Sequence, residues 1–348
     1  MNILVFNLAV DSKDSALSFT TDWLNEIAKK YDTVFVITLR GDMKNISKNI
    51  KTFKLYNKVK NKPLAIIRFY YYLLMILFNH KISRCFSHMN PLFLVLTFGI
   101  LKILKIKTIL WYTHPAITLK LRIATFLTDK VVSASQFSFP IKTNKLIPIG
   151  HGIDPTFFNQ SFENKQIKYI SVVGRISEVK NIELIIRAYS KLNHKKYKLI
   201  IIGDTITKED INYKEKLIKI IFKKNLQNLV EFKDSLNRDE LSKVYNDSLC
   251  LINATKFGSF DKVVLEAMIC GTPTLSHNIA FKDLYFPFEK YCIFEYNNEI
   301  DLSEKLKKLI ELDSKKLVNI KKTLYNNTIS NHSLTTINSR LENIFRLI

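Results

Sequence analysis

Short apolar runs alternate with amphipathic segments along this chain, and the order begins twice. The first half opens with an apolar run at 3–6, followed by a polar loop, an amphipathic stretch at 19–30 and a second apolar run at 34–38. Apolar runs of this length are typical of strands that are buried on both faces. Strands that alternate with helices form parallel sheets with helices on both faces. The sequence therefore predicts an α/β chain with doubly wound, Rossmann-like sheets.

The second half repeats this order after residue 168. Strands are predicted at 169–173, 198–202, 230–232 and 249–253, and helices at 182–192, 213–224 and 238–246. A chain of 348 residues is long enough for two domains of ordinary size. Gly150 and Gly152 flank His151 in a turn, where we expect the hinge between the domains to begin. The expected divisions are 1–158, 159–332 and a last helix at 333–348.

The charge of the chain favours an anionic surface over nucleic acid. The net charge is +22, and only nine of the 53 basic residues are arginine. Nucleic-acid readers rely on arginine, whereas a diffuse lysine excess suits membrane headgroups or a phosphorylated glycan. No recognition-helix, zinc-finger or RNA-binding motif occurs in the sequence, so specific nucleic-acid binding is disfavoured.

Cysteine usage favours a reducing compartment. Cys85, Cys250, Cys270 and Cys292 are far apart and mostly lie in apolar runs, which indicates neither a disulfide framework nor a metal site. The first strand follows directly on Met1-Asn2, without a signal peptide. We therefore expect a cytoplasmic protein, at the inner face of the plasma membrane if the lysine excess serves membrane contact.

The apolar segment at 63–78 has two interpretations that both stay open. It is flanked by lysines and contains Arg68, and it is too short for a transmembrane helix. It forms either a buried helix of the first domain or a helix that places aromatic residues at the bilayer interface while lysines reach the headgroups. The segment at 92–105 repeats this composition on a smaller scale.

Polar residues at the ends of predicted strands locate a ligand site. In open α/β sheets, ligands bind at the carboxyl ends of the strands, and His88 and His114 each follow a predicted strand of the first half. The loop at 7–18 contains no glycine, so the chain lacks the dinucleotide-binding fingerprint of nicotinamide and flavin dehydrogenases. We therefore expect a ligand other than a dinucleotide.

A cationic loop follows the predicted strand at 169–173. It contains Gly174, Arg175 and Lys180, and in a parallel sheet these residues face the same crevice as Gly258. Together they form a cradle for a pyrophosphate that needs no metal ion. The sequence contains no Asp-x-Asp motif, which also argues against a metal-bridged diphosphate. The alternative for Arg175 is an ordinary salt bridge.

The stretch at 255–276 reads as a loop, a short helix and a strand. Ser259 or Asp261 is the expected N-cap, and Gly271 and Pro273 end the helix. Glu266 interrupts an otherwise apolar run, so its carboxylate needs a partner, which is either a ribose or an internal hydrogen bond. Free backbone N–H groups at the helix start, behind Gly258 and Ser259, would suit a phosphate.

Three motifs give the chain a family resemblance. The segments at 174–180, 265–273 and 149–154 resemble those of the retaining glycosyltransferases of family 4, which have the GT-B fold. The resemblance implies two Rossmann-like domains that face each other across a cleft, with a nucleotide-sugar donor held mainly by the second domain and an acceptor by the first. It also implies a last helix that crosses back onto the first domain.

The resemblance assigns roles to individual residues. Arg175 and Lys180 would bind the donor diphosphate, Glu266 the ribose hydroxyls, and His114 would lie at the junction of sugar and acceptor. Further nucleotide contacts would come from Gly174, Gly258, Ser259, Asp261, Val263 and Val264. No cofactor or metal ion is expected beyond a UDP-, GDP- or other nucleoside-diphosphate sugar.

Two departures from the family pattern bear on specificity. The family usually has a glutamate eight positions before the ribose-binding one, and here Gly258 occupies that position. Asp261 and Ser259 are the candidates to take over its contacts with the donor sugar. The glycines often found in the first strand–helix loop are absent as well, so the acceptor chemistry of the family does not transfer to this chain.

The expected function is transfer of a hexosyl unit, with retention, from a nucleotide sugar to a glycan or lipid-linked acceptor, in polysaccharide, lipopolysaccharide or glycolipid synthesis. The rival enzyme is a nucleotide-sugar epimerase on the same scaffold. The alternative from another class is a noncatalytic glycan- or membrane-binding module, which the missing carboxylate at Gly258 makes conceivable.

Overall fold

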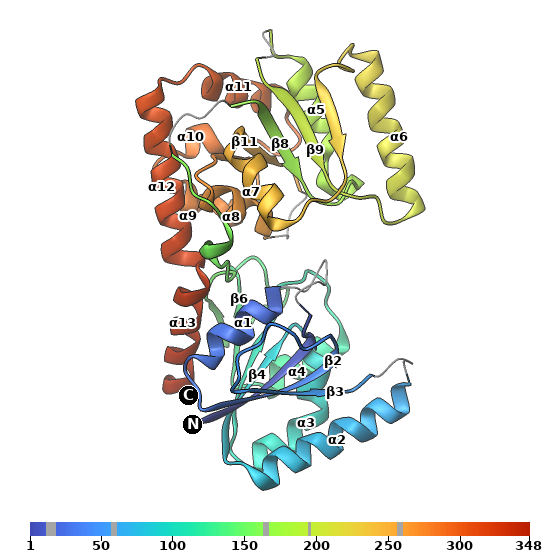
Figure 1. The fold of residues 1–348 in the computed structure, drawn as a ribbon, viewed down its shortest axis with the longest axis vertical. Helices are drawn as coiled ribbons and strands as arrows, with labels where there is room; N and C mark the ends of the chain where they lie inside the picture. Colours follow the sequence, from blue (N-terminus) through green and yellow to red (C-terminus); the bar gives the residue numbers. More distant parts are fainter. Residues whose placement is uncertain (12–18, 57–60, 163–166, 194–195, 256–259) are drawn as a thin grey trace. The chain divides into compact units, whose positions relative to one another are not determined.

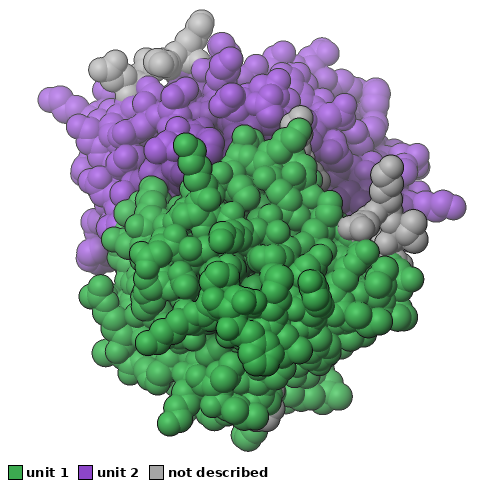
Figure 2. All heavy atoms as spheres, turned by 60° about the horizontal axis from the view of Figure 1, so that its bottom comes forward, with its two compact units in different colours: residues 1–152, 334–348 green, residues 153–333 purple. Residues whose placement is uncertain are grey.

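The computed structural model describes residues 1–11, 19–56, 61–162, 167–193, 196–255 and 260–348 (Figure 1). The chain divides into two compact units, which Figure 2 shows in different colours. Unit 1 contains residues 1–152 and 334–348, and unit 2 contains residues 153–333. The chain thus passes from one unit to the other between Gly152 and Ile153, within the expected hinge, and returns after Ser333.

Unit 1 contains a seven-stranded, fully parallel sheet in the order β3-β2-β1-β4-β5-β6-β7. Its strands are β1 (Asn2–Ala9), β2 (Thr33–Arg40), β3 (Ile50–Lys54), β4 (Ile82–His88), β5 (Lys107–Trp111), β6 (Lys130–Ser133) and β7 (Leu146–Pro148). β3, β6 and β7 were not predicted from the sequence. β6 and β7 have only four and three residues, and the edge strand β3 exposes Lys51 and Lys54 and has no continuous apolar run.

Three helices cover one face of this sheet. From β3 the chain crosses the sheet in one direction, through β4 and β5 to β6. The three connections are made by α2 (Lys62–Asn79), α3 (Pro91–Ile103) and α4 (Leu119–Leu127). Because such connections are right-handed, the three helices lie on the same face of the sheet. The Tyr70 hydroxyl on α2 donates a hydrogen bond of 3.2 Å to the Leu96 carbonyl on α3. α2 buries one side, which includes Phe69 and Leu73, and exposes an apolar opposite side. It therefore has features of both interpretations of the 63–78 segment.

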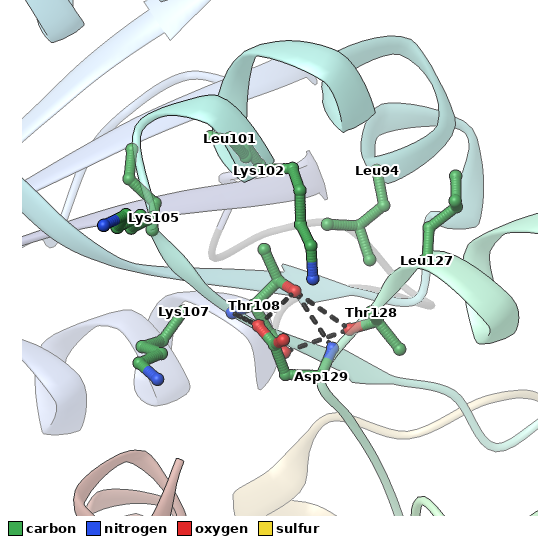
Figure 3. A pocket seen from close by; sticks show the side chains of 10 residues that line it. Leu94, Leu101, Lys102, Lys105, Lys107, Thr108, Leu127, Thr128 and Asp129 are labelled. Atoms are coloured by element: carbon green, nitrogen blue, oxygen red, sulfur yellow. Dashed lines mark hydrogen bonds between the residues drawn. The ribbon is translucent and has the colours of Figure 1, made fainter.

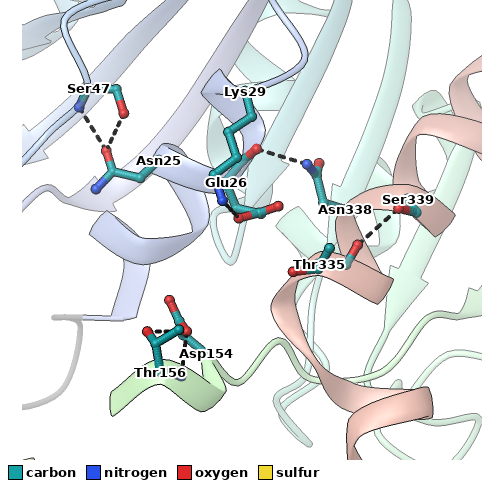
Figure 4. Close-up of polar contacts among 9 residues, drawn as sticks. All are labelled: Asn25, Glu26, Lys29, Ser47, Asp154, Thr156, Thr335, Asn338 and Ser339. Carbon is teal, nitrogen blue, oxygen red and sulfur yellow. Dashed lines mark hydrogen bonds and ion pairs between the residues drawn. The ribbon is translucent and has the colours of Figure 1, made fainter.

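The C-terminal helix belongs to unit 1. α13 (Leu334–Leu347) packs against α1 (Phe19–Ala28), and the Asn338 amide donates to the Glu26 carbonyl at 2.8 Å (Figure 4). Further along α13, the Glu342 carboxylate accepts hydrogen bonds from the Tyr31 hydroxyl at 2.5 Å and from Arg84 Nη1 at 2.8 Å. These polar contacts attach the end of the chain to its beginning.

Unit 2 contains a five-stranded parallel sheet in the order β10-β9-β8-β11-β12 (Figure 1). Its strands are β8 (Tyr169–Val173), β9 (Lys198–Ile202), β10 (Val230–Lys233), β11 (Ser248–Asn253) and β12 (Thr274–Ser276). The helices that connect them are α5 (Ile182–Ser190), α6 (Lys208–Lys223), α7 (Arg238–Asn246) and α8 (Lys262–Ile269). Short 3₁₀ turns lie at Pro155–Phe157, Glu178–Lys180 and Ile279–Phe281, and the remaining helices are α9 (Lys282–Tyr285), α10 (Glu289–Cys292), α11 (Glu299–Ile310) and α12 (Ser314–His332).

The predicted fold class is confirmed. Both units have parallel sheets with helices between the strands, and the strands expected at 169–173 and 198–202 have these bounds in the structure. The helix expected at 213–224 begins earlier, at Lys208, because a capping box of Thr207 and Asp210 starts it with a polar first turn. The four cysteines are buried and unbonded to one another.

Candidate functional site

In the parallel sheet of unit 2, the order in which the chain adds strands reverses between β8 and β11. From β8 the chain moves outward through β9 to β10, and it then returns to β11 and β12 on the other side of β8. The loops after β8 and β11 therefore lead to opposite faces of the sheet, and this switch point is where doubly wound sheets bind ligands. Arg175 and Lys180 follow β8, and Asp261 and Glu266 follow β11.

The loop after β8 lies close to the loop after β9. Gly174 has φ +135°, a conformation that side-chain-bearing residues rarely adopt. A Cβ atom at Gly203 would lie 2.1 Å from the Gly174 carbonyl oxygen, and a Cβ atom at Gly174 would lie 3.3 Å from Lys180 Cε. Glycine at these positions thus allows close backbone packing and lets the Lys180 side chain lie across Gly174.

Arg175 forms an ion pair with Asp210. Its Nε lies 2.6 Å from Asp210 Oδ2, and Nη2 lies 3.5 Å from the Thr207 hydroxyl. Asp210 is buried at the start of α6, and its hydrogen bond with Arg175 holds the pKa of this carboxyl below its usual value. The Arg175 side chain keeps 42% of its surface exposed, so it is held at one edge and open to solvent elsewhere. The salt bridge considered as an alternative is thus present, and it leaves part of the guanidinium accessible.

Lys180 connects the loop after β8 to the start of α8. Its Nζ lies 2.6 Å from Asp261 Oδ2, and the same oxygen accepts hydrogen bonds from Asn253 Nδ2 at 2.7 Å and from the Thr255 hydroxyl at 2.6 Å. Asp261 is the N-cap residue of α8, but its side chain makes no capping hydrogen bond. Its carboxylate instead fixes the position of Lys180 at the switch point.

Glu266 lies on α8 beside Tyr245 of α7. The Tyr245 hydroxyl donates a hydrogen bond of 3.3 Å to Glu266 Oε2, so the internal partner considered in the sequence analysis is present. Burial raises the pKa of Glu266, and the charges of Lys262 and Arg238 oppose this shift. The carboxylate thus has one rather long hydrogen bond from Tyr245 and retains capacity for further donors.

The remaining predicted residues have different surroundings. Val264 is fully buried and its amide donates to the Asp261 carbonyl at 3.2 Å, whereas Val263 is partly exposed. Gly258 and Ser259 lie outside the described residues. His114 belongs to unit 1, where it follows β5, is exposed, and accepts a hydrogen bond from the Ala116 amide through Nδ1 at 3.0 Å.

Several residues that position Arg175, Lys180 and Glu266 were not predicted from the sequence. Asp210, Asn253, Thr255 and Tyr245 were not selected, although Asn253 ends a predicted strand and Thr255 lies just after it, at the position where ligand-site residues concentrate. Asp210 and Tyr245 lie on helices and are brought to the site by tertiary packing, so no local pattern indicates them. Among the described residues, no group of three or more His, Cys, Asp or Glu residues is arranged to hold a metal ion.

Comparisons with known proteins identify the family and the fold of the chain. The family model for glycosyl transferases group 1 matches residues 154–327, which is half of the chain and most of unit 2. A human protein named GDP-Man:Man(3)GlcNAc(2)-PP-Dol alpha-1,2-mannosyltransferase is 29% identical over 161 residues, which are 43% of this chain and 33% of the human protein. The chain thus aligns with about a third of the length of this relative.

Solved structures of the same fold cover the whole chain. HepE of Anabaena, crystallised in complex with UDP, has a TM-score of 0.77 at 16% identity, and the match covers 100% of both chains. The lipopolysaccharide outer core galactosyltransferase WaaB has a TM-score of 0.70 at 13% identity, again with 100% of both chains covered. These matches confirm the GT-B fold predicted from the sequence. With the match over residues 154–327, they show that the chain belongs to the family of glycosyl transferases group 1.

Proposed function

We propose that the chain transfers a hexosyl unit from a nucleoside-diphosphate sugar to a glycan or lipid-linked acceptor, with retention at the anomeric carbon and without a metal ion. One observation carries the proposal: Lys180 and Asp261 join the loops after β8 and β11 at the switch point of the sheet that the family model matches. The UDP complex of HepE and the GDP-mannose chemistry named for the human relative support a nucleotide-sugar donor.

The cations at this site suit a leaving diphosphate. As the bond between sugar and diphosphate breaks, negative charge accumulates on the phosphate oxygens. Lys180 has three N–H donors and gives one to Asp261, and Arg175 binds Asp210 through Nε. The remaining donors can bind the diphosphate, and because both side chains are already fixed by carboxylates, little reorganisation is needed during the reaction.

Glu266 and His114 complete the proposed assignment. Glu266 would accept hydrogen bonds from the ribose hydroxyls, which would supplement the hydrogen bond from Tyr245. His114, which follows β5 of unit 1, would contact the transferred sugar or the acceptor hydroxyl. We place the reaction in the synthesis of a cell-surface polysaccharide or glycolipid at the cytoplasmic face of the membrane, in keeping with the lipopolysaccharide enzyme among the structural neighbours.

Substitution of Arg175 tests the proposal. Arg175→Ala should reduce the release of nucleoside diphosphate from the accepted donor sugar by about 100-fold or more, as when a donor to a developing anion is lost. Arg187→Ala is a matched control, because Arg187 also lies in unit 2, pairs with a carboxylate and has 42% of its side chain exposed. Activity of Arg175→Ala within twofold of Arg187→Ala would contradict the assignment. Turnover should be unchanged in EDTA.

Two further measurements separate the rival functions. The donor alone, incubated with the protein and analysed by NMR, should yield no isomerised nucleotide sugar, whereas an epimerase would produce one. Calorimetric titration with UDP and GDP should detect binding of one of them, whereas a noncatalytic module that has lost the donor site would bind neither.

A further inference from the structure

Three helices of unit 1 end at one edge of its sheet with a large apolar side chain exposed. α2, α3 and α4 lead into β4, β5 and β6, which are neighbours in the sheet, so their last turns lie along the amino-terminal edge of these strands. The exposed fraction is 84% for Phe78, 80% for Ile103 and 79% for Phe126. Helices that cover a sheet normally present polar residues to water, so this row indicates an apolar partner.

The segment that contains these three helices is strongly basic. Residues 43–128 include fifteen lysines and arginines and no aspartate or glutamate. Exposed Lys81 and Lys105 follow the last turns of α2 and α3, and partly exposed Lys130 follows that of α4. A partner that matches this surface therefore combines an apolar layer with negative charge.

A pocket opens between α3 and α4 at this edge (Figure 3). Its volume is about 350 Å³, and its lining includes three leucines and three lysines: Leu94, Leu101, Leu127, Lys102, Lys105 and Lys107. The Lys102 side chain points toward Thr108 and Thr128 at the base of the pocket. The acid in the lining, Asp129, already accepts hydrogen bonds from the Thr108 amide at 2.7 Å and hydroxyl at 2.9 Å. The lysines thus dominate the charge of the pocket.

Lys145 adds to this positive field. Its Nζ donates to the carbonyls of Thr125, Phe126 and Thr128, which neutralises the carboxyl end of α4. Burial lowers the pKa of Lys145, and the ammonium groups of Lys102 and Lys130 lower it further, against the opposing effect of Asp129. Basic side chains therefore gather closely enough around the pocket to influence one another.

We propose that this edge binds the surface of an anionic phospholipid bilayer and that the pocket holds a headgroup phosphate between its lysines. The basal surface is defined here as Phe78, Ile103, Leu104 and Phe126 with Lys81, Lys102, Lys105, Lys107 and Lys130. The apolar side chains enter the bilayer interface and the lysines contact headgroups. A bilayer offers an apolar interior next to anionic headgroups, so it can bind both kinds of side chain. Nucleic acid offers negative charge but no apolar layer that could bury Ile103 and Leu104.

Vesicle binding tests the charge requirement. The full chain should co-sediment with vesicles in which about one third of the lipid is phosphatidylglycerol and the rest phosphatidylcholine. It should not co-sediment with vesicles of pure phosphatidylcholine. The triple variant Lys102→Gln, Lys105→Gln, Lys107→Gln should bind on the order of 100-fold more weakly, since each lysine near a charged bilayer contributes roughly fivefold. The control removes the same charge from exposed lysines at the carboxyl end of α6 in unit 2: Lys219→Gln, Lys223→Gln and Lys224→Gln.

Depth-dependent fluorescence quenching tests the insertion. The two natural tryptophans, Trp23 and Trp111, are buried, so lipid should not reach them. Brominated phosphatidylglycerol should therefore quench Phe78→Trp and Phe126→Trp strongly, and the control Phe222→Trp on α6, which is also an exposed phenylalanine, much less.

Several outcomes would overturn the proposal. These are equal binding to neutral vesicles, an equal loss in the α6 control, or equal quenching at residue 222. Tighter binding to a DNA duplex than to anionic vesicles would assign the charge to nucleic acid instead. The surface is independent of the proposed transferase site, so Arg175→Ala should bind vesicles as the parent does, and the basal variants should bind nucleoside diphosphate normally.

Discussion

At the scale of single residues, Glu266 has two candidate roles that an experiment can separate: binding of the ribose and an internal structural hydrogen bond with Tyr245. Burial raises its pKa, so the folded chain binds this proton more tightly than the unfolded chain does. The folded state is therefore favoured at pH values below the unfolded pKa, and this contribution is lost as the pH rises through the folded pKa. Above the folded pKa, the ionised Glu266 thus costs stability, which is expected of a group kept for binding.

Glu266→Gln should retain or raise the Tm at pH 7.5, because a neutral amide avoids the cost of a buried charge. The same change should weaken nucleoside diphosphate binding by about 10-fold or more, through loss of charge-assisted hydrogen bonds to the ribose. Thermal unfolding and calorimetry measure both effects, with Glu215→Gln on the exposed side of α6 as control. The parent should also lose affinity as the pH falls toward the raised pKa, and the variant should not. A lower Tm with unchanged affinity would indicate a structural role.

Residue roles could be predicted from the sequence only in part. Gly174, Arg175 and Lys180 were selected because they follow an apolar strand, and the structure places them at the switch point of the sheet. The pairing of Lys180 with Asp261 could not be predicted, since it joins positions 81 residues apart through the fold. Asp261 therefore looked like a free contact for the donor sugar, although one of its oxygens already accepts three donors.

At the scale of elements, α13 is attached to unit 1 by a buried polar cluster. Glu342 accepts from Tyr31 and Arg84, and Arg84 Nη1 also donates to the Tyr31 hydroxyl at 2.9 Å. The Arg84 and Glu342 side chains are each 11% exposed. Removing one partner would leave the other charge nearly buried and unpaired, which costs more than the pair itself contributes.

Glu342→Ala should reduce the free energy of unfolding by about 3 kcal/mol, which corresponds to a Tm loss of roughly 6–12 °C for a unit of this size. The affinity for nucleoside diphosphate should not change, because the proposed donor site lies in unit 2. Glu304→Ala, at an exposed position of α11, is the control for removing a glutamate. If Glu342→Ala unfolds at the same temperature as this control, α13 is held by its apolar contacts alone.

Elements with strong apolar patterns could be predicted, and those without them could not. β8 and β9 were placed correctly because their buried residues form continuous apolar runs. β3 was missed because an edge strand needs no apolar run on both faces. The composition of α2 left two interpretations open because the helix is apolar on its buried and on its exposed side.

At the scale of the whole molecule, the two proposals assign different ligands to different units. The residues proposed for the donor diphosphate and ribose lie in unit 2, whereas the basal surface lies in unit 1. No helix among the described parts of the chain is both long and apolar enough to cross a bilayer. The basal surface lies at the amino-terminal edge of its sheet and His114 follows the opposite edge, a separation of about 17 Å for a five-residue strand such as β5. This distance suits a glycan that extends from the membrane as the acceptor.

Hydrogen exchange should therefore show two separate footprints. The matching nucleoside diphosphate should slow exchange at 174–180 and 260–266, because ligand binding stabilises the loops after β8 and β11. Anionic vesicles should slow exchange at the ends of α2, α3 and α4, near residues 76–82, 101–107 and 126–130, and should leave the unit 2 segments unaffected. Neutral vesicles serve as control. Nucleotide protection that appears at the ends of α2–α4 instead would place the donor in unit 1 and contradict both assignments, since the same surface cannot hold the nucleotide and the bilayer.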